Sequence, residues 1–140
     1  MTDAERARRV LFVCTHNAGR SIVAAALLNA RRPPRGAADS AGTDPADALN
    51  PTVVTALAER GITLTGVCPK AISTELLASA DLVVTMSRHP TGPPFPGAST
   101  HQQHWQLDFP GDDLEAMRAF CTEVDHRVQA LIADLHPPSR

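Results

Sequence analysis

One stretch near the start of the chain constrains its fold most strongly. Residues 10–13 (VLFV) are a short apolar run rich in β-branched and aromatic side chains, which is typical of a strand buried on both faces. A polar loop at 14–20 follows, and residues 21–30 (SIVAAALLNA) favour a helix that Pro33 and Pro34 end. A buried strand, a tight loop and a helix in this order predict the start of a parallel sheet covered by helices.

The rest of the chain repeats this alternation of strands and helices. The elements expected next are a strand at 37–43, a helix from Asn50-Pro51 to Gly61, a helix from Ser73 to about Ala80, a strand at 82–86, a short strand around Trp105 and an amphipathic helix from Leu114 to Leu135. We therefore predict one α/β domain over residues 1–140, a three-layer sandwich with a central four-stranded parallel sheet and helices on both faces.

Two segments between these elements are less regular. The stretch from Arg88 to His104 is rich in proline and glycine, and we expect a long connection without secondary structure, a kind of loop that is usually functional or disordered. Asp112 and Asp113 precede the last helix, where negative charge favours the helix start. We interpret this pair as a helix-start signal rather than as catalytic carboxylates.

The composition argues against several classes of protein. The 140 residues carry 13 basic and 15 acidic side chains, a formal net charge of -2, which does not predict a basic face for nucleic acid or an anionic membrane. No apolar run approaches the roughly 20 residues of a membrane span, and residues 1–9 lack the apolar segment of a signal peptide. We therefore expect a soluble cytoplasmic protein.

The cysteines and histidines narrow the chemistry further. Cys14, Cys68 and Cys121 are too few and too scattered for a disulfide scaffold, and they contain no CxxC pair. His101 and His104 have no cysteine or carboxylate within the HQQH stretch to complete a site, so we expect no metal. Cys121 lies on the apolar stripe of the last helix, where cysteine packs as a small hydrophobic residue.

The loop after the first strand is the strongest candidate site. It reads CTHNAGRS over residues 14–21 and leads into a helix start, where free backbone N–H groups can surround a tetrahedral oxyanion. Arg20 adds a fork-shaped cation, and it and the helix dipole both favour the thiolate form of Cys14. Gly19 is expected to allow a backbone geometry that other residues resist. A nucleophile beneath a bound oxyanion is an arrangement for covalent catalysis.

The pattern C-x5-R-S directly after a first strand resembles the low-molecular-weight protein tyrosine phosphatase superfamily. The motif HNAGRS at residues 16–21 is similar to the motif of the arsenate reductase branch of that superfamily. Further matching segments follow in the expected order: Ser40-Ala41-Gly42-Thr43, Asn50-Pro51, Gly61-Ile62, residues 80–86 (ADLVVTM), Phe95-Pro96-Gly97 and His104-Trp105. The resemblance spans nearly the whole chain and implies an enzyme that acts on arsenate or on a phosphate-type oxyanion.

The resemblance also assigns roles to residues of the loop. It implies that Cys14 is the nucleophile, that Ser21 supports its thiolate and that Asn17 rigidifies the loop. The residues implied to bind the oxyanion are Thr15, His16, Asn17, Ala18, Gly19 and Arg20.

Two positions depart from the family pattern. Phe109 stands where members usually carry an Asp as general acid, so either Asp108, one residue earlier, supplies the proton or the site lacks its acid. Ser87 stands where thioredoxin-coupled arsenate reductases place a second cysteine, after the VVTM-type strand. The resemblance therefore implies no bound cofactor, an external low-molecular-weight thiol as co-substrate, as in the mycothiol-dependent subgroup, and a glutaredoxin-like reductase as partner.

Three functions stay open at this point. A thiol-dependent arsenate reductase fits the loop sequence best. In that case His16 or a water molecule is a candidate proton donor. A phosphatase with a phosphocysteine intermediate is the alternative, and it suffers most from the absent Asp because its leaving alkoxide needs a proton. An oxyanion-binding protein without turnover is the third.

Overall fold

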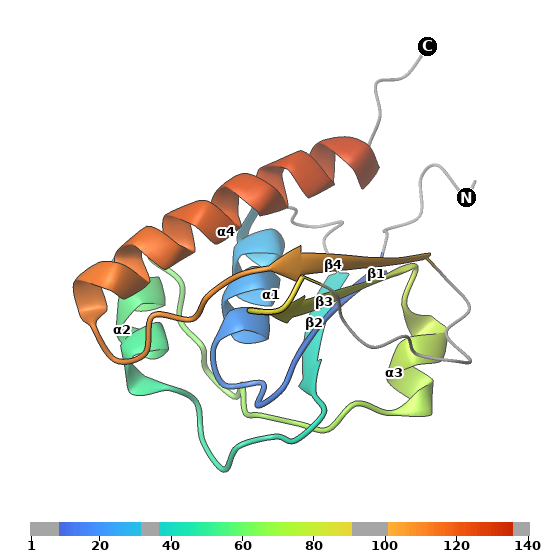
Figure 1. Cartoon of the computed structure of the whole chain (residues 1–140), viewed down its shortest axis with the longest axis horizontal. Coiled ribbons are helices and arrows are strands. Elements are labelled where there is room, and N and C mark those ends of the chain that lie inside the picture. The colour runs from blue at the N-terminus through green and yellow to red at the C-terminus, as the bar shows by residue number, and fades with distance from the viewer. Residues whose placement is uncertain (1–8, 32–36, 91–100, 136–140) are drawn as a thin grey trace.

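The computed structural model describes residues 9–31, 37–90 and 101–135, and in them strands and helices alternate as predicted (Figure 1). The elements are β1 (Arg9–Cys14), α1 (Arg20–Arg31), β2 (Ala37–Gly42), α2 (Pro51–Glu59), α3 (Thr74–Ser79), β3 (Leu82–Ser87), β4 (His101–Gln106) and α4 (Leu114–Leu135). The predicted stop of the first helix at Pro33 and Pro34 lies outside the described residues. No helix in the described ranges is long and apolar enough to cross a membrane.

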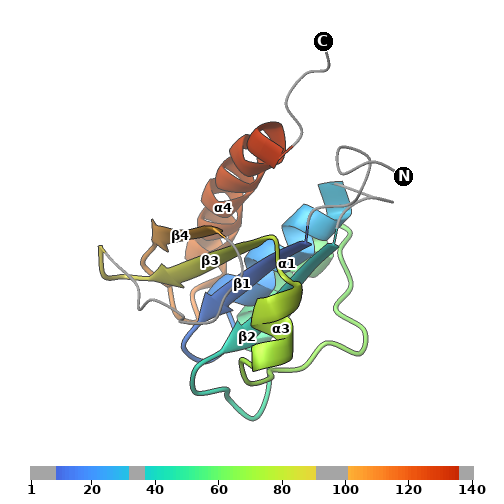
Figure 2. The same ribbon diagram turned by 90° about the vertical axis from the view of Figure 1, so that its right-hand side faces the viewer.

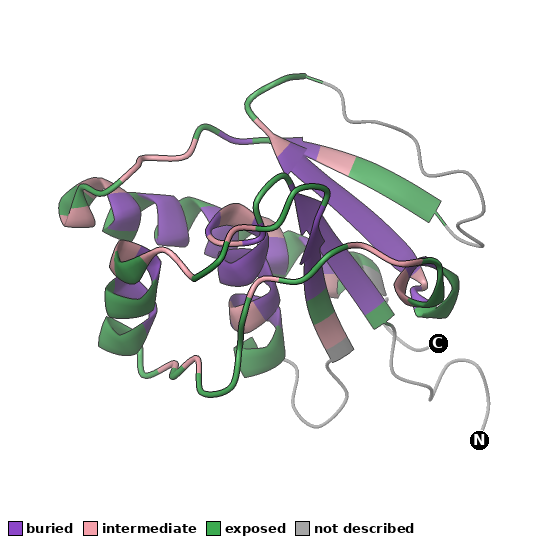
Figure 3. Cartoon of the chain, turned by 90° about the horizontal axis from the view of Figure 1, so that it is seen from below, coloured by how far each residue is buried: buried purple, intermediate pink, exposed green. Residues whose placement is uncertain are grey.

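The strands form one four-stranded sheet in the order β2-β1-β3-β4, with every neighbouring pair parallel. The two central strands are buried on both faces, which is why they read as continuous apolar runs (Figure 3). Phe12 of β1 lies opposite Ser40 of β2 on one side and Val84 of β3 on the other. The predicted parallel sheet is confirmed.

One boundary prediction was wrong. The connection expected to lack structure from Arg88 to His104 is shorter, because β4 already begins at His101 and pairs with β3 from Leu82 to Ser87. β4 is an edge strand with mostly exposed polar side chains, so its backbone pairing gives no alternating apolar pattern in the sequence. Residues 91–100, which include the Phe95-Pro96-Gly97 match, lie outside the described residues.

The helices cover both faces of the sheet, as predicted (Figure 2). Helices α1, α2 and α4 pack on one face, in a core that includes Phe12, Val84 and Trp105. The short helix α3 covers the other face through Leu77, which packs with Leu11 of β1. The result is a three-layer α/β sandwich with unequal outer layers.

Side-chain caps place the helix starts where the sequence predicted them. The Oδ1 of Asn50 accepts hydrogen bonds from the backbone N–H groups of Thr52 (2.8 Å) and Val53 (3.4 Å) at the start of α2. Asp113 accepts in the same way from the N–H groups of Glu115 and Ala116 at the start of α4. This capping explains the acidic pair before α4 without a catalytic role.

Candidate active site

The loop from Cys14 to Arg20 lies at the carboxyl edge of the sheet, beside the segment that follows β2 (Figure 1). That segment donates backbone N–H groups to loop carbonyls: Asp44 to Thr15 (2.8 Å), Ala46 to His16 (2.9 Å) and Asn50 to Ala18 (3.1 Å). Because a trans peptide points its C=O and N–H in opposite directions, the next N–H groups along the loop point away from this segment. Such convergent N–H groups suit an oxyanion.

Asn17 fixes the shape of the loop from inside. Its φ is 49°, in the left-handed region that Asn tolerates better than most residues, and its side chain is fully buried. The Oδ1 of Asn17 accepts from the backbone N–H of Lys70 (3.0 Å), and its Nδ2 donates to the Oγ of Ser21 (2.8 Å). Its implied stiffening role agrees with these contacts.

The sulfur of Cys14 lies 2.9 Å from the Oγ of Ser21, and both side chains are buried. The Asn17 amide already donates to this Oγ, so the hydroxyl hydrogen of Ser21 is available to the sulfur. A hydroxyl that donates to the sulfur stabilises the thiolate, the form that acts as a nucleophile. The geometry therefore fits the roles implied for Cys14 and Ser21.

Two contacts with described residues hold Arg20 in place. Its Nε donates to the backbone carbonyl of Leu107 (2.9 Å), and its guanidinium carbon lies 5.6 Å from the ring centre of Phe109. Its terminal amino groups have no hydrogen bond with the described part of the chain, so they can bind two oxygens of an anion. Burial lowers the pKa of Arg20, while the nearby Cys14 and Asp108 side chains oppose this shift.

Gly19 is required for a different reason from the one predicted. Among the described residues its φ is not in the left-handed region, so no unusual backbone torsion demands glycine. A Cβ at Gly19 would instead lie 2.4 Å from Cε1 of Phe109. The ring of Phe109 rests against Gly19 on one side and against Phe120 on the other, with the two ring centres 5.7 Å apart.

Through this packing, Phe109 occupies the place in the cleft where the general acid was expected. Phe109 lines the cleft above Cys14, whereas Asp108 is exposed and is not among the lining residues. Asp108 still lies close enough to interact electrostatically with Arg20. The structure brings Cys14, His16, Ala18, Gly19 and Arg20 together in one cleft and leaves Asp108 at its margin.

The cleft has an apolar wall that sequence reasoning did not identify. Its volume is about 370 Å³, and the wall facing the loop comes from the segment after β2 and the start of α2. The residues of this wall are Ala46, Ala48, Leu49, Asn50 and Pro51. Asn50-Pro51 signalled only a helix start in the sequence, and the small residues before it carried no signal of their own.

The other two cysteines differ in exposure. Cys121 is fully buried in the core, and burial raises the pKa of its thiol, as suits a packing residue. Cys68 is exposed, in the connection before α3. Ser87, at the position where a second cysteine was considered, ends β3, and its Oγ lies 3.3 Å from Nε2 of His104. The Nδ1 of His104 pairs with the Thr85 hydroxyl (2.6 Å), so both ring nitrogens of this histidine are engaged.

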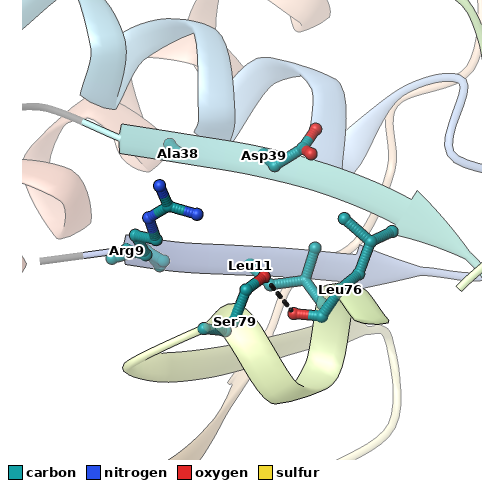
Figure 4. A pocket seen from close by; sticks show the side chains of 8 residues that line it. Arg9, Leu11, Ala38, Asp39, Leu76 and Ser79 are labelled. Atoms are coloured by element: carbon teal, nitrogen blue, oxygen red, sulfur yellow. Dashed lines mark hydrogen bonds between the residues drawn. The ribbon is translucent and has the colours of Figure 1, made fainter. Parts of the chain in front are cut away.

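A second hollow lies at the opposite edge of the sheet and has a different character (Figure 4). It is lined by Arg9, Asp39, Leu76 and Ser79, among others, and Ser79 donates to the backbone carbonyl of Leu76 (3.2 Å). Asp39 is already paired with Lys70. Among the described residues that line this hollow there is no cysteine, no histidine and no carboxylate without an ion-pair partner.

We next compared the chain with known proteins. A putative arsenate reductase from Halobacterium salinarum is 32% identical and covers 96% of this chain and 98% of its own. A thioredoxin-dependent arsenate reductase from Corynebacterium glutamicum shares 32% identity with a TM-score of 0.77; the match covers 94% of this chain but 63% of that longer one. An arsenate reductase in the phosphate binding state reaches a TM-score of 0.82 at 27% identity, over 91% of this chain and 98% of its own.

The family model covers the Cys14 loop and the wall of the cleft that follows β2, while Phe109 lies beyond the matched residues. It matches residues 9–94, from β1 through the segment after β3, and so includes the whole of the Cys14 loop. The chain belongs to the low molecular weight phosphotyrosine protein phosphatase family.

Proposed function

We propose that this enzyme is a thiol-dependent arsenate reductase. The observation that carries the proposal is the position of Phe109, which lines the cleft beside Arg20 at the sequence position where phosphatases of this family usually carry the acid. The described lining of the cleft thus offers a nucleophile and an oxyanion site but no carboxylate to protonate an alkoxide leaving group. All three relatives described above are named arsenate reductases, which supports arsenate as the substrate.

The proposed reaction begins with arsenate in the loop. The thiolate of Cys14 attacks arsenic, a sulfur–arsenic bond forms, and one oxygen leaves as water after it takes up a proton. The N–H groups of the loop and the terminal amino groups of Arg20 hold the remaining oxygens and their charge. Arsenic stays pentavalent in this step, so a second sulfur must supply the electrons.

That second sulfur comes from outside the chain in this proposal. An external thiolate attacks the sulfur of Cys14; a disulfide forms, the sulfur–arsenic bond breaks, and its electron pair leaves with arsenic as trivalent arsenite. Cys121 is buried in the core, Ser87 carries no sulfur, and the exposed Cys68 does not stand at the second-cysteine position of the thioredoxin-coupled enzymes, so we assign the resolving role to an external thiol. A low-molecular-weight thiol of the mycothiol type is the proposed co-substrate, and a glutaredoxin-like reductase would regenerate Cys14.

The second candidate is a phosphatase, favoured by the family model and by the position of Asp108 near Arg20. In that case Asp108 would have to move into the cleft to protonate the leaving group. Asp108→Ala separates the two functions, because it should remove a robust phosphatase activity but leave arsenate reduction largely intact.

The test compares two assays on the purified protein. One uses p-nitrophenyl phosphate; the other uses arsenate with candidate thiols and their reductases, and measures arsenite. Arsenite formation that depends on thiol and on Cys14 supports the proposal. Strong phosphatase activity that Asp108→Ala abolishes refutes it, and anion binding without turnover in either assay indicates an oxyanion-binding protein.

A further inference from the structure

The reaction proposed above needs a proton donor, and the described lining of the cleft contains no carboxylic acid to serve as one. When the Cys14 thiolate attacks arsenate, the departing oxygen has to receive a proton to leave as water. Asp108 lies outside the lining of the cleft, and Phe109 occupies the place beside Arg20; His16 is exposed, as Asp108 is, but it does line the cleft. Apart from the nucleophile Cys14 and the permanently charged Arg20, His16 is the one ionisable side chain in the described lining of the cleft, and an imidazole can serve as a general acid.

The hydrogen bonds of His16 fix which of its two nitrogens can do this. Its Nδ1 lies 2.9 Å from the backbone carbonyl of Asp44. A carbonyl oxygen only accepts, so Nδ1 must carry a hydrogen, and in the neutral ring Nε2 is the unprotonated nitrogen. No residue of the described chain contacts Nε2 by a hydrogen bond. Nε2 can therefore gain or lose a proton while the bond to Asp44 stays intact.

The backbone around His16 holds this arrangement rigidly. The carbonyl of His16 accepts from the N–H of Ala46 (2.9 Å), and the N–H of Asp44 donates to the carbonyl of Thr15 (2.8 Å). The imidazole is thus fixed to the segment after β2 by its ring and by the backbone on both sides. A general acid gains from such support because its position is set before the substrate arrives.

We propose that His16 is the general acid of this site, a role that rests on the proposed function. Protonated Nε2 gives its hydrogen to the oxygen that leaves arsenic as the bond to the Cys14 sulfur forms. The As–O bond breaks, the oxygen departs as water, and His16 is left neutral with the hydrogen on Nδ1. Solvent then restores the proton on Nε2. No carboxylate takes part, so Phe109 in the acid position is compatible with turnover.

This proposal predicts a distinctive pH profile. Activity needs protonated His16 and the thiolate of Cys14, so kcat/KM should fall at high pH when the imidazole loses its proton. The ionisable groups of the elements around the cleft are Cys14 and Arg20 in the loop, Asp44 and Asp47 after β2, Lys70 before α3, Arg88 after β3, and Asp108 and Asp112 after β4. The pH profile of a variant without the imidazole separates the contribution of His16 from the contributions of these groups and of arsenate itself.

Two substitutions separate the acid role from the structural one. In His16→Asn the side-chain amide can still donate to Asp44, but no titrating nitrogen remains. In His16→Gln an N–H group reaches further into the cleft and again cannot titrate. Both variants should lose about 10²- to 10⁴-fold in kcat for arsenate reduction. Binding of arsenate should change only a few-fold, and the fall at high pH should disappear.

The control is His126→Asn, an exposed histidine on α4 away from the cleft, which should behave as wild type. If wild type reduces arsenate and His16→Asn has the same kcat and pH profile, His16 is not the acid and only this inference fails. If wild type reduces no arsenate with any thiol, the proposed function fails instead.

A measurement that needs no turnover also tests the inference. The ¹⁵N NMR signals of His16 in neutral free enzyme should show hydrogen on Nδ1, and the Nε2 signal should move when arsenate is added. Hydrogen on Nε2, or a signal that arsenate leaves unchanged, would overturn the inference.

Discussion

The contact between Gly19 and Phe109 makes a quantitative prediction about the cleft. In Gly19→Ala the new Cβ would lie 2.4 Å and 2.5 Å from two ring carbons of Phe109, whereas ordinary van der Waals contact begins at 3.4 Å. The ring must therefore retreat by about 1 Å. Phe120 blocks one path, because its own ring is buried and packs edge-on against Phe109.

Two effects should follow from this displacement. Overpacking of this kind typically lowers the free energy of unfolding by about 1–3 kcal/mol, and chemical denaturation measures it. The ring of Phe109 also supports the guanidinium of Arg20, and a misplacement of about 1 Å in a catalytic group can lower the rate about 10²-fold. Gly19→Ala should thus lower both stability and kcat/KM.

A double-mutant cycle identifies the cause. Phe109→Ala removes the clashing ring, so Gly19→Ala should lower the free energy of unfolding by less in that background. The expected coupling energy is about 0.5–3 kcal/mol. Gly42→Ala is the matched control, since its Cβ would lie 2.6 Å from the backbone oxygen of Thr15 and no side-chain truncation can relieve that. The reasoning is refuted if Gly19→Ala is as stable and active as wild type, or if Phe109→Ala rescues Gly42→Ala equally well.

Three further predictions concern the reaction and the fold. Cys14→Ser should abolish turnover but retain anion binding measured by calorimetry, whereas Arg20→Lys should weaken both, because an ammonium cannot bind two oxygens as a guanidinium does. Phe109→Asp should raise p-nitrophenyl phosphatase activity by placing an acid in the cleft, and unchanged activity would show that this side chain does not reach the leaving group. Hydrogen bonds from Arg31 lower the pKa of Asp125, so this pair stabilises the fold above the ordinary carboxyl pKa of about 3.9 and the stabilisation is lost as pH falls through the lowered value. Asp125→Asn should lower the free energy of unfolding by about 1–2 kcal/mol at pH 7; the loss stays small because the Arg31 side chain is 43% exposed and solvent screens the pair. The variant should also flatten the acid limb of a curve of stability against pH.

Most of the fold was predictable because its signals are local. Residues 10–13 and 82–86 are buried on both faces of a parallel sheet, so their apolar runs stand out. Asn50 and Ser73 cap the helices that they were expected to start. The strand expected around Trp105 is present, but its start at His101 was missed because an exposed edge strand is held by backbone pairing, which leaves no side-chain pattern.

The candidate site was predictable in its chemistry but not in its geometry. Cys14, Arg20 and Ser21 lie within one short loop, so the sequence alone indicates a thiol beside a cation. The contacts that decide what the loop can do come from far along the chain. Phe109 against Gly19 and Lys70 against Asn17 are examples. No local pattern indicates them, because each depends on how the carboxyl ends of separate strands meet at one edge.

The substituted acid position and the support of His16 are best understood together. A site that cleaves phosphoesters must protonate a poor alkoxide leaving group, and a carboxylic acid beside the cleft serves that purpose. A site that expels water from arsenate can take the proton from an imidazole held on the loop itself, as the bond from His16 to the Asp44 carbonyl allows. The position after β4 is then free to carry Phe109, whose ring fixes Arg20 instead of giving a proton. One exchange of a carboxylate for an aromatic ring would thus trade leaving-group protonation for a more rigid oxyanion site, and the Phe109→Asp and His16→Asn variants test the two halves of that trade separately.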